Sequence, residues 1–223
     1  RRHAVDDTIR TMGVKRQRSW VSEARFKPYL EECGGSEDDA WRPYEWNARV
    51  SSALSECIHH VEVLLRNAMI AELETLHPLQ YPWHSDNSTI HQIAQKKRRS
   101  AGVSADPDDI IANLNLGYWQ QFLQDKPADN EDLWRTTLRR AFPHSRGDRK
   151  TVLNAMEDLF ELRNRCAHQD SLLGFDPSVE LKKIIKLARW VDPDAGRWIE
   201  SIEQVTGVVD ARPIPPKMNA VII

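Results

Sequence analysis

This chain of 223 residues has almost no net charge, no CxxC cysteine pair and no glycine-rich loop of the phosphate-binding kind. Its 31 Lys and Arg nearly balance 33 Asp and Glu, giving a formal net charge of −2. No overall polycation is therefore present to hold nucleic acid by its phosphates, and any such binding must come from local basic patches. The three cysteines, Cys33, Cys57 and Cys166, form no CxxC pair, which argues against a disulfide framework and favours a reducing cytoplasm.

Further absences narrow the chemistry. No apolar run approaches the roughly 18 residues of a membrane-spanning helix, and we find no signal peptide, so we expect no membrane span. No glycine-rich loop of the phosphate-binding kind occurs, which leaves nucleotide hydrolysis without support. The histidines show no spacing that brings three metal ligands together. We therefore expect neither a metal nor a cofactor.

Helical periodicity dominates the sequence, and no segment alternates with the period of two that is typical of a strand. The longest predicted helix runs from about Trp46 to Leu76, and apolar residues cover much of its circumference, as in a helix packed on several sides. We predict an all-α, single-domain, multi-helix bundle around this long central helix. Shorter helices are predicted at residues 20–33, 108–124, 130–141, 150–168, 179–190 and 194–205. Two more have one predicted limit each: one begins at residue 36, and another ends near residue 100.

Six consecutive residues near the end of the helix predicted at 150–168 carry the candidate chemistry: Arg163-Asn164-Arg165-Cys166-Ala167-His168. At about 100° per residue, Arg163 falls about 20° from Val152, in the middle of the apolar stripe. Asn164 and His168 lie together at the polar edge of that stripe. A guanidinium cannot be neutralised by losing its proton, so we expect Arg163 to have a partner.

The spacing of Arg163, Asn164 and His168 resembles the signature of the HEPN superfamily: an arginine, a polar residue, a few residues and a histidine. Other blocks resemble the Abi-like (abortive-infection) branch of that superfamily, in the same order along residues 20–213. These blocks are Ser22–Phe26, Pro28–Leu30, Tyr44–Asn47, Val61–Asn67, Leu116–Trp119, Leu133–Trp134 and Leu138–Pro143. The resemblance implies an Abi-like HEPN helical domain at 19–211, preceded by a basic arm or helix at 1–18 and followed by a Pro-containing tail at 212–223.

The resemblance also implies a metal-independent endoribonuclease in which the 2′-hydroxyl of RNA attacks the phosphate and leaves a 2′,3′-cyclic phosphate. This reaction needs a base, an acid and a cation that stabilises the developing charge. His168 suits proton transfer near neutral pH. The planar fork of Arg163 suits two phosphate oxygens. Asn164 is expected to orient the imidazole or to contact the phosphate.

Partners are expected from the same resemblance. One motif supplies one histidine, and family members bring two motif helices together across a twofold axis, so we expect a homodimer with a composite active site. The expected substrate is tRNA or mRNA, and the expected role is that of a toxin-like effector in antiphage defence in the cytoplasm. An antitoxin or another regulatory partner would accompany such an effector.

Two further groups of residues are candidates for the site. Glu62, Arg66 and Asn67 recur in the family pattern, where Glu62 either supports Arg163 or forms a scaffold pair with Arg66. Arg66 is also a candidate for an additional phosphate contact. A basic RNA-binding patch is predicted just before the motif helix, at Arg139, Arg140, Arg146, Arg149 and Lys150. The eight tryptophans are scattered singly and suit core anchors, while base stacking by one or two of them stays open.

The sequence leaves three alternatives open. Arg163 can be a structural ion pair with Glu62, and His168 can cap the end of its helix. On that interpretation the protein is a non-catalytic HEPN helical module that binds RNA or a partner protein. A third interpretation is an accessory, antitoxin-like protein that neutralises another effector.

Overall fold

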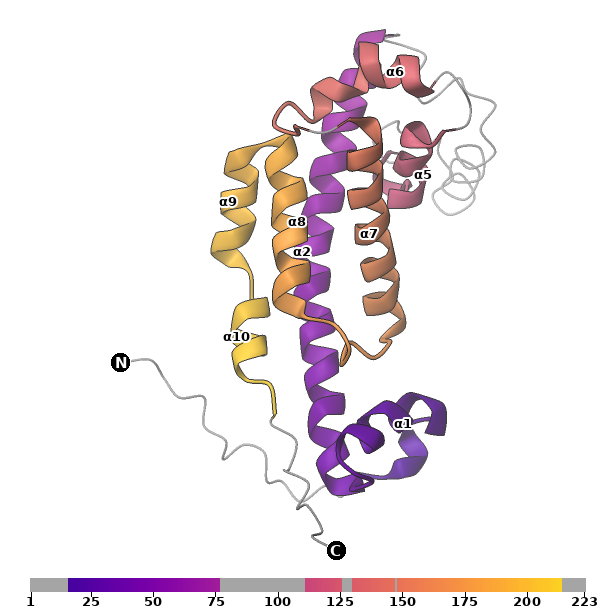
Figure 1. Ribbon diagram of the computed structural model, residues 1–223, viewed down its shortest axis with the longest axis vertical. Helices are drawn as coiled ribbons and strands as arrows, with labels where there is room; N and C mark the ends of the chain where they lie inside the picture. The colour runs from indigo at the N-terminus through magenta and orange to yellow at the C-terminus, as the bar shows by residue number, and fades with distance from the viewer. Residues whose placement is uncertain (1–15, 77–110, 126–129, 147, 214–223) are drawn as a thin grey trace, which may run out of the picture. The chain divides into compact units, whose positions relative to one another are not determined.

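The computed structural model describes residues 16–76, 111–125, 130–146 and 148–213, and in these ranges every regular element is a helix (Figure 1). The all-α class is therefore confirmed. The chain divides into two compact units, Arg1–Tyr44 with Ile214–Ile223, and Glu45–Pro213. None of the described helices is long and apolar enough to cross a membrane. The helix predicted to end near Ser100 lies outside the described residues.

In the first unit, α1 (Glu23–Glu32) presents aromatic side chains to the start of α2 (Glu37–Leu76). The rings of Phe26 and Trp41 lie 4.7 Å apart, and Tyr29 meets Tyr44 edge-on at 5.4 Å. Gly35 at the end of α1 has a φ of +85°, which favours glycine and ends the helix as predicted.

The long helix begins earlier than predicted. We expected Pro43 to break the chain before Trp46, but α2 is continuous from Glu37 through Pro43. Proline removes one helical hydrogen bond without necessarily ending the helix when packing favours its continuation. Helix α1 provides such packing here, because its Phe26 and Tyr29 rings meet those of Trp41 and Tyr44 on either side of Pro43.

In the second unit, α2 runs between α7 (Arg149–His168) and α8 (Pro177–Val191), with α9 (Pro193–Ile202) beside α8 (Figure 1). The apolar residues that cover this part of α2 are mostly buried, at Val50, Leu54, Cys57, Ile58, Val61, Leu65 and Met69, and Leu64 is partly buried. They pack in one hydrophobic core with the buried faces of α7 and α8. The expected long central helix is thus present.

Shorter elements complete this unit: α5 (Leu116–Gln120), α6 (Asn130–Thr136), α10 (Val205–Asp210), and the 3₁₀ turns η3 (Gln121–Leu123) and η4 (Leu138–Ala141). One further 3₁₀ turn, η2 (Arg18–Trp20), belongs to the first unit. The continuous helix predicted at 108–124 is interrupted, because Asn115 starts a new helix by accepting a hydrogen bond from the backbone of Tyr118. Near the end of the described residues the chain likewise forms two helices, α9 and α10, where one was predicted at 194–205.

Helix α7, which carries the motif, has its predicted limits because both ends are capped. Asp148 accepts a 2.9 Å hydrogen bond from the backbone N–H of Thr151 at the start. Gln169 takes the left-handed conformation, with a φ of 53°, at the end. His168 is therefore the last helical residue.

Candidate functional site

The second half of α7 holds Arg163 at the surface. We expected this side chain in the middle of the apolar stripe, but it is 45% exposed. The buried residues of this half are Leu159, Leu162 and Cys166, which at about 100° per residue lie on the far side of Val152 from Arg163. The buried face of α7 thus turns around the helix along its length and leaves Arg163 at its edge.

Arg163 has two partners. Its Nε lies 3.7 Å from Oε1 of Glu62 on α2, and its Nη1 donates a 3.2 Å hydrogen bond to Oδ1 of Asn164. The pairing with Glu62, one of the alternatives that the sequence left open, is therefore present. The contact with Glu62 directs the guanidinium toward α2, and the bond to Asn164 restricts its rotation, while nearly half of the side chain stays accessible to a ligand.

Glu62 lies in a partly desolvated position between the two helices. Burial raises the pKa of its carboxyl above the ordinary value of 4.5, and the positive groups of Arg163, His59 and Arg66 partly oppose this rise. Its Oε1 is buried and accepts no hydrogen bond from the described residues. The carboxyl therefore depends on the charge of Arg163 for compensation.

Arg66 and Asn67 continue this polar cluster along α2. Arg66 Nε donates to Oδ1 of Asn67 at 3.5 Å, and its Nη1 donates to the carbonyl oxygen of Ala112 at 3.4 Å. Both bonds are long, so they hold Arg66 weakly. Arg66 acts on Glu62 through its charge.

His168 is exposed at the last position of α7. Five helical residues place it roughly 7.5 Å along the axis from Arg163 and about 140° around it. Asn164, one turn before His168, lies on the same side of the helix within about 40° of it. The structure thus brings together Arg163, Asn164 and Glu62, whereas His168 belongs to the outer face of α7.

Cys166 lies inside the motif but cannot serve as its nucleophile. Its side chain is 5% exposed, and burial raises the pKa of its thiol to about 11, against a small lowering by a hydrogen bond with Ser55. A thiol with this pKa is almost fully protonated at neutral pH. The candidate chemistry therefore rests on the polar residues around it.

The predicted basic patch contains two arginines, Arg140 and Arg149, that form ion pairs with carboxylates of the same unit. Arg149 is 12% exposed and donates to Glu131 at 2.8 Å, to Asp125 at 2.7 Å and to the carbonyl oxygen of Leu123. Arg140 donates to Glu72 at 2.7 Å. Both arginines therefore brace neighbouring elements.

The rest of the patch, Arg139, Arg146 and Lys150, is exposed. Arg149 and Arg163 are the first and fifteenth residues of α7, so this region lies about 20 Å along the helix from Arg163.

Sequence reasoning gave no role to Asn47, which positions the chain just after His168. Its Nδ2 donates to the carbonyl oxygen of Asp170 at 3.1 Å, and its Oδ1 accepts a 2.7 Å bond from the backbone N–H of Leu172. Asn47 is 3% exposed. A signal was present in the sequence, because an amide on the apolar face of the long helix, one turn before Val50, needs buried partners.

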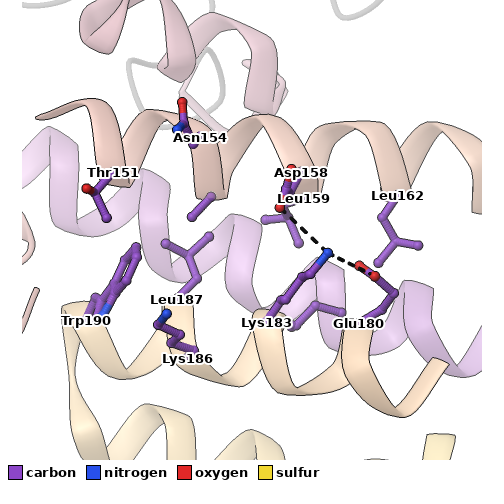
Figure 2. A pocket seen from close by; sticks show the side chains of 12 residues that line it. Thr151, Asn154, Asp158, Leu159, Leu162, Glu180, Lys183, Lys186, Leu187 and Trp190 are labelled. Atoms are coloured by element: carbon purple, nitrogen blue, oxygen red, sulfur yellow. Dashed lines mark hydrogen bonds and ion pairs between the residues drawn. The ribbon is translucent and has the colours of Figure 1, made fainter. Parts of the chain in front are cut away.

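A separate groove lies between α7 and α8 (Figure 2) and encloses about 310 Å³. Apolar side chains, among them Leu159, Leu187 and Trp190, form its floor. At its edge Lys183 lies 3.7 Å from Asp158 and 3.0 Å from Glu180. None of the three motif residues lines this groove.

Among the described residues, no group of three His, Cys, Asp or Glu side chains is placed to hold a metal ion. Comparisons with protein-family models, curated proteins and solved structures found no match. The chemical interpretation of the site therefore rests on its own geometry and on the sequence blocks quoted above.

Proposed function

We propose that the protein is a metal-independent endoribonuclease of the Abi-like HEPN type, with Arg163, Asn164 and His168 as its catalytic residues. The observation that supports this most is the state of Arg163: it is oriented by Asn164 and Glu62, yet its guanidinium stays accessible. A permanent cation held in one orientation on the surface is suited to a phosphate that gains negative charge during the reaction.

In the proposed reaction the 2′-oxygen of the substrate forms a bond to phosphorus as the bond from phosphorus to the 5′-oxygen breaks. One imidazole accepts the 2′ proton and a second donates a proton to the leaving 5′-oxygen. Arg163 and Asn164 would contact the non-bridging oxygens. The products are a 2′,3′-cyclic phosphate and a free 5′-hydroxyl, with no change in the number of protons.

The position of His168 supports a composite site. Because His168 lies on the outer face of α7, a second copy that meets this face would bring its own imidazole beside the first and supply the second proton-transfer group. We therefore retain the homodimer in the proposal. Cleavage of tRNA or mRNA in the cytoplasm as a toxin-like antiphage effector, restrained by an antitoxin or another regulator, rests on the family resemblance alone.

The second candidate function is a non-catalytic helical module that binds RNA or a partner protein. The pairing of Arg163 with Glu62 favours it, because a guanidinium engaged by a carboxylate is less available to phosphate. On this interpretation Glu62 and Arg163 connect α2 to α7 and have no chemical role.

Cleavage of total tRNA and of a single-stranded RNA in the presence of EDTA separates these two functions. The proposal expects cutting that persists in EDTA, leaves 2′,3′-cyclic phosphate ends and disappears in His168→Ala and Arg163→Ala. Matched controls are His144→Ala and Arg135→Ala, which remove an exposed histidine and an exposed arginine elsewhere in the same unit. Circular dichroism establishes that each variant is folded. RNA binding without any cutting by the wild type would favour the binding module.

A further inference from the structure

The indole of Trp198, on α9, is 49% exposed, which is unusual beside the buried indoles of Trp46, Trp119 and Trp134. It meets the ring of His60 on α2 with centroids 4.7 Å apart and planes inclined by 62°. The charged neighbours of Trp198 on α9 form ion pairs with other side chains: Arg197 with Asp194, and Glu200 with Arg189. Trp198 is therefore a single aromatic surface within a polar environment.

From Trp198 two ring contacts lead onto α2, on the way toward the motif. The rings of His60 and His59 have centroids 6.0 Å apart, and His59 is exposed on the outer side of α2 with Ser52 and Glu56. One helical turn further along α2, Glu62 meets Arg163. The exposed indole and the accessible guanidinium thus each contact α2 within one helical turn, at His60 and Glu62.

We propose that Trp198, supported by His60, is a stacking platform for one base of a single-stranded RNA whose chain continues over His59 toward Arg163. An aromatic side chain can stack any base, because every base has a π-face. His60 meets the indole at an inclined angle and supports the ring, while about half of the side chain stays exposed. The proposal names a substrate subsite for the proposed ribonuclease, and in that respect it rests on the proposed function.

The local charges favour recognition of a base here over a row of phosphate contacts. Glu56 and Glu62 both lie on this part of α2, and the second is paired with Arg163. An RNA held here would gain most of its affinity from stacking. The patch is also small for a protein partner, since a single indole surrounded by paired charges is far from the contiguous apolar area that specific protein interfaces bury.

The test is the affinity of a short, fluorescently labelled single-stranded RNA, measured by anisotropy in a His168→Ala background in which substrate should not be consumed. Trp198→Ala should weaken binding about tenfold, and Trp198→Phe should keep most of the affinity because a ring remains. The dependence of affinity on salt should be the same in Trp198→Ala as in its parent, since no charge is removed. Trp20→Ala, which removes another indole that is exposed among the described residues, is the matched control and should leave affinity unchanged.

Affinity within about twofold of the parent in Trp198→Ala would overturn the stacking platform, as would equal losses in the Phe and Ala variants. A change of oligomeric state in Trp198→Ala with unchanged RNA affinity would overturn it too, and would assign this surface to a second copy of the chain. Failure of the ribonuclease proposal is separately visible: an uncleaved RNA that still binds through Trp198 refutes cleavage and supports the platform. Cleavage by the wild type, with an RNA affinity that does not depend on Trp198, supports the ribonuclease and refutes the platform.

Discussion

The side chain of Asn47 accepts a 2.7 Å hydrogen bond from the backbone N–H of Leu172 across the interior of the second unit. The same amide donates to the carbonyl oxygen of Asp170. Because these two residues follow the end of α7 directly, Asn47 fixes the path of the chain where it leaves the motif helix. The position of His168 thus depends on a residue that lies 121 positions earlier in the sequence, as 168 minus 47.

Asn47→Ala should destabilise the fold by about 1–3 kcal/mol, because the buried N–H of Leu172 and the part-buried carbonyl of Asp170 each lose their partner. Asn47→Asp should lie between the wild type and the Ala variant, since a carboxylate can still accept from Leu172 but cannot donate to Asp170. Urea unfolding followed by circular dichroism measures both.

Asn67→Ala is the control for Asn47. Asn67 is also on α2, but it is exposed and has one long contact with Arg66. Its removal should change stability by less than about 0.5 kcal/mol. Equal effects at the two positions would contradict the role given to Asn47.

Arg149→Ala should lower stability by about 1–3 kcal/mol, because its guanidinium joins the start of α7 to Asp125, Glu131 and the Leu123 carbonyl through charged hydrogen bonds. Arg146→Ala, at an exposed position near the same helix start, should have little effect on stability. Thermal unfolding of the two variants makes the comparison. If Arg146→Ala were the more destabilising of the two, the bracing role of Arg149 would be wrong.

The same pair of variants addresses the predicted RNA patch. An arginine that binds phosphate contributes to the salt dependence of RNA affinity, whereas an arginine engaged by carboxylates does not. We expect Arg149→Ala to leave the slope of affinity against salt unchanged. A smaller slope in Arg149→Ala would show that its guanidinium leaves its carboxylate partners for the RNA.

Local features of the sequence were sufficient to predict the helical class and the limits of α7. Its start depends on the Asp148 cap and its end on residues near Gln169, all within one turn of the boundary. Pro43 misled the prediction for α2, because the aromatic packing that carries the helix through it involves α1, another element of the chain. Propensity describes one segment at a time, and tertiary packing can override it.

The site was less predictable for the same reason. A fixed angular step placed Arg163 in the apolar stripe, but the buried face of α7 turns around the helix as its neighbours change along its length. The partners of Arg149 lie in other elements, so its apparent membership of a basic run carried no information about its contacts. The contact between Trp198 and His60 joins residues 138 positions apart, as 198 minus 60, and no local pattern indicates it.

The three cysteines should react slowly with a thiol reagent in the native protein. Cys33, Cys57 and Cys166 are each at most 6% exposed, and burial raises the pKa of the Cys57 and Cys166 thiols to about 11. The reactive species is the thiolate, which is rare under these conditions.

Ellman's reagent at mildly alkaline pH should therefore label three thiols rapidly in urea and none rapidly without it. Cys166→Ser should retain any RNA cleavage, since the thiol has no part in the proposed reaction. One thiol that reacts rapidly in the native protein would contradict the burial described above. Loss of cleavage in a folded Cys166→Ser variant would give the thiol a role.

Glu62→Gln should alter how stability depends on pH. Burial raises the pKa of the Glu62 carboxyl above its ordinary value of 4.5, so the folded chain binds this proton more tightly than the unfolded chain does. The contribution of Glu62 to stability is then most favourable below the ordinary pKa and declines as pH rises through the interval up to the raised pKa. Wild type should therefore lose stability relative to Glu62→Gln across this interval.

The measurement is the free energy of unfolding by urea at a series of pH values from about 4 to 7, for wild type, Glu62→Gln and Glu161→Gln, over the interval in which a raised carboxyl pKa acts. Glu161 is a suitable control because it also pairs with an arginine, Arg165, but is exposed on the outer side of α7. We expect the free energy of unfolding of the wild type to fall further below that of Glu62→Gln as pH rises, while Glu161→Gln follows the wild type. A difference that shrinks with rising pH would mean that the charge of Arg163 outweighs burial, so that Glu62 and Arg163 form a stabilising ion pair. The guanidinium would then be held by the carboxylate more firmly than phosphate binding allows, which would favour the non-catalytic module.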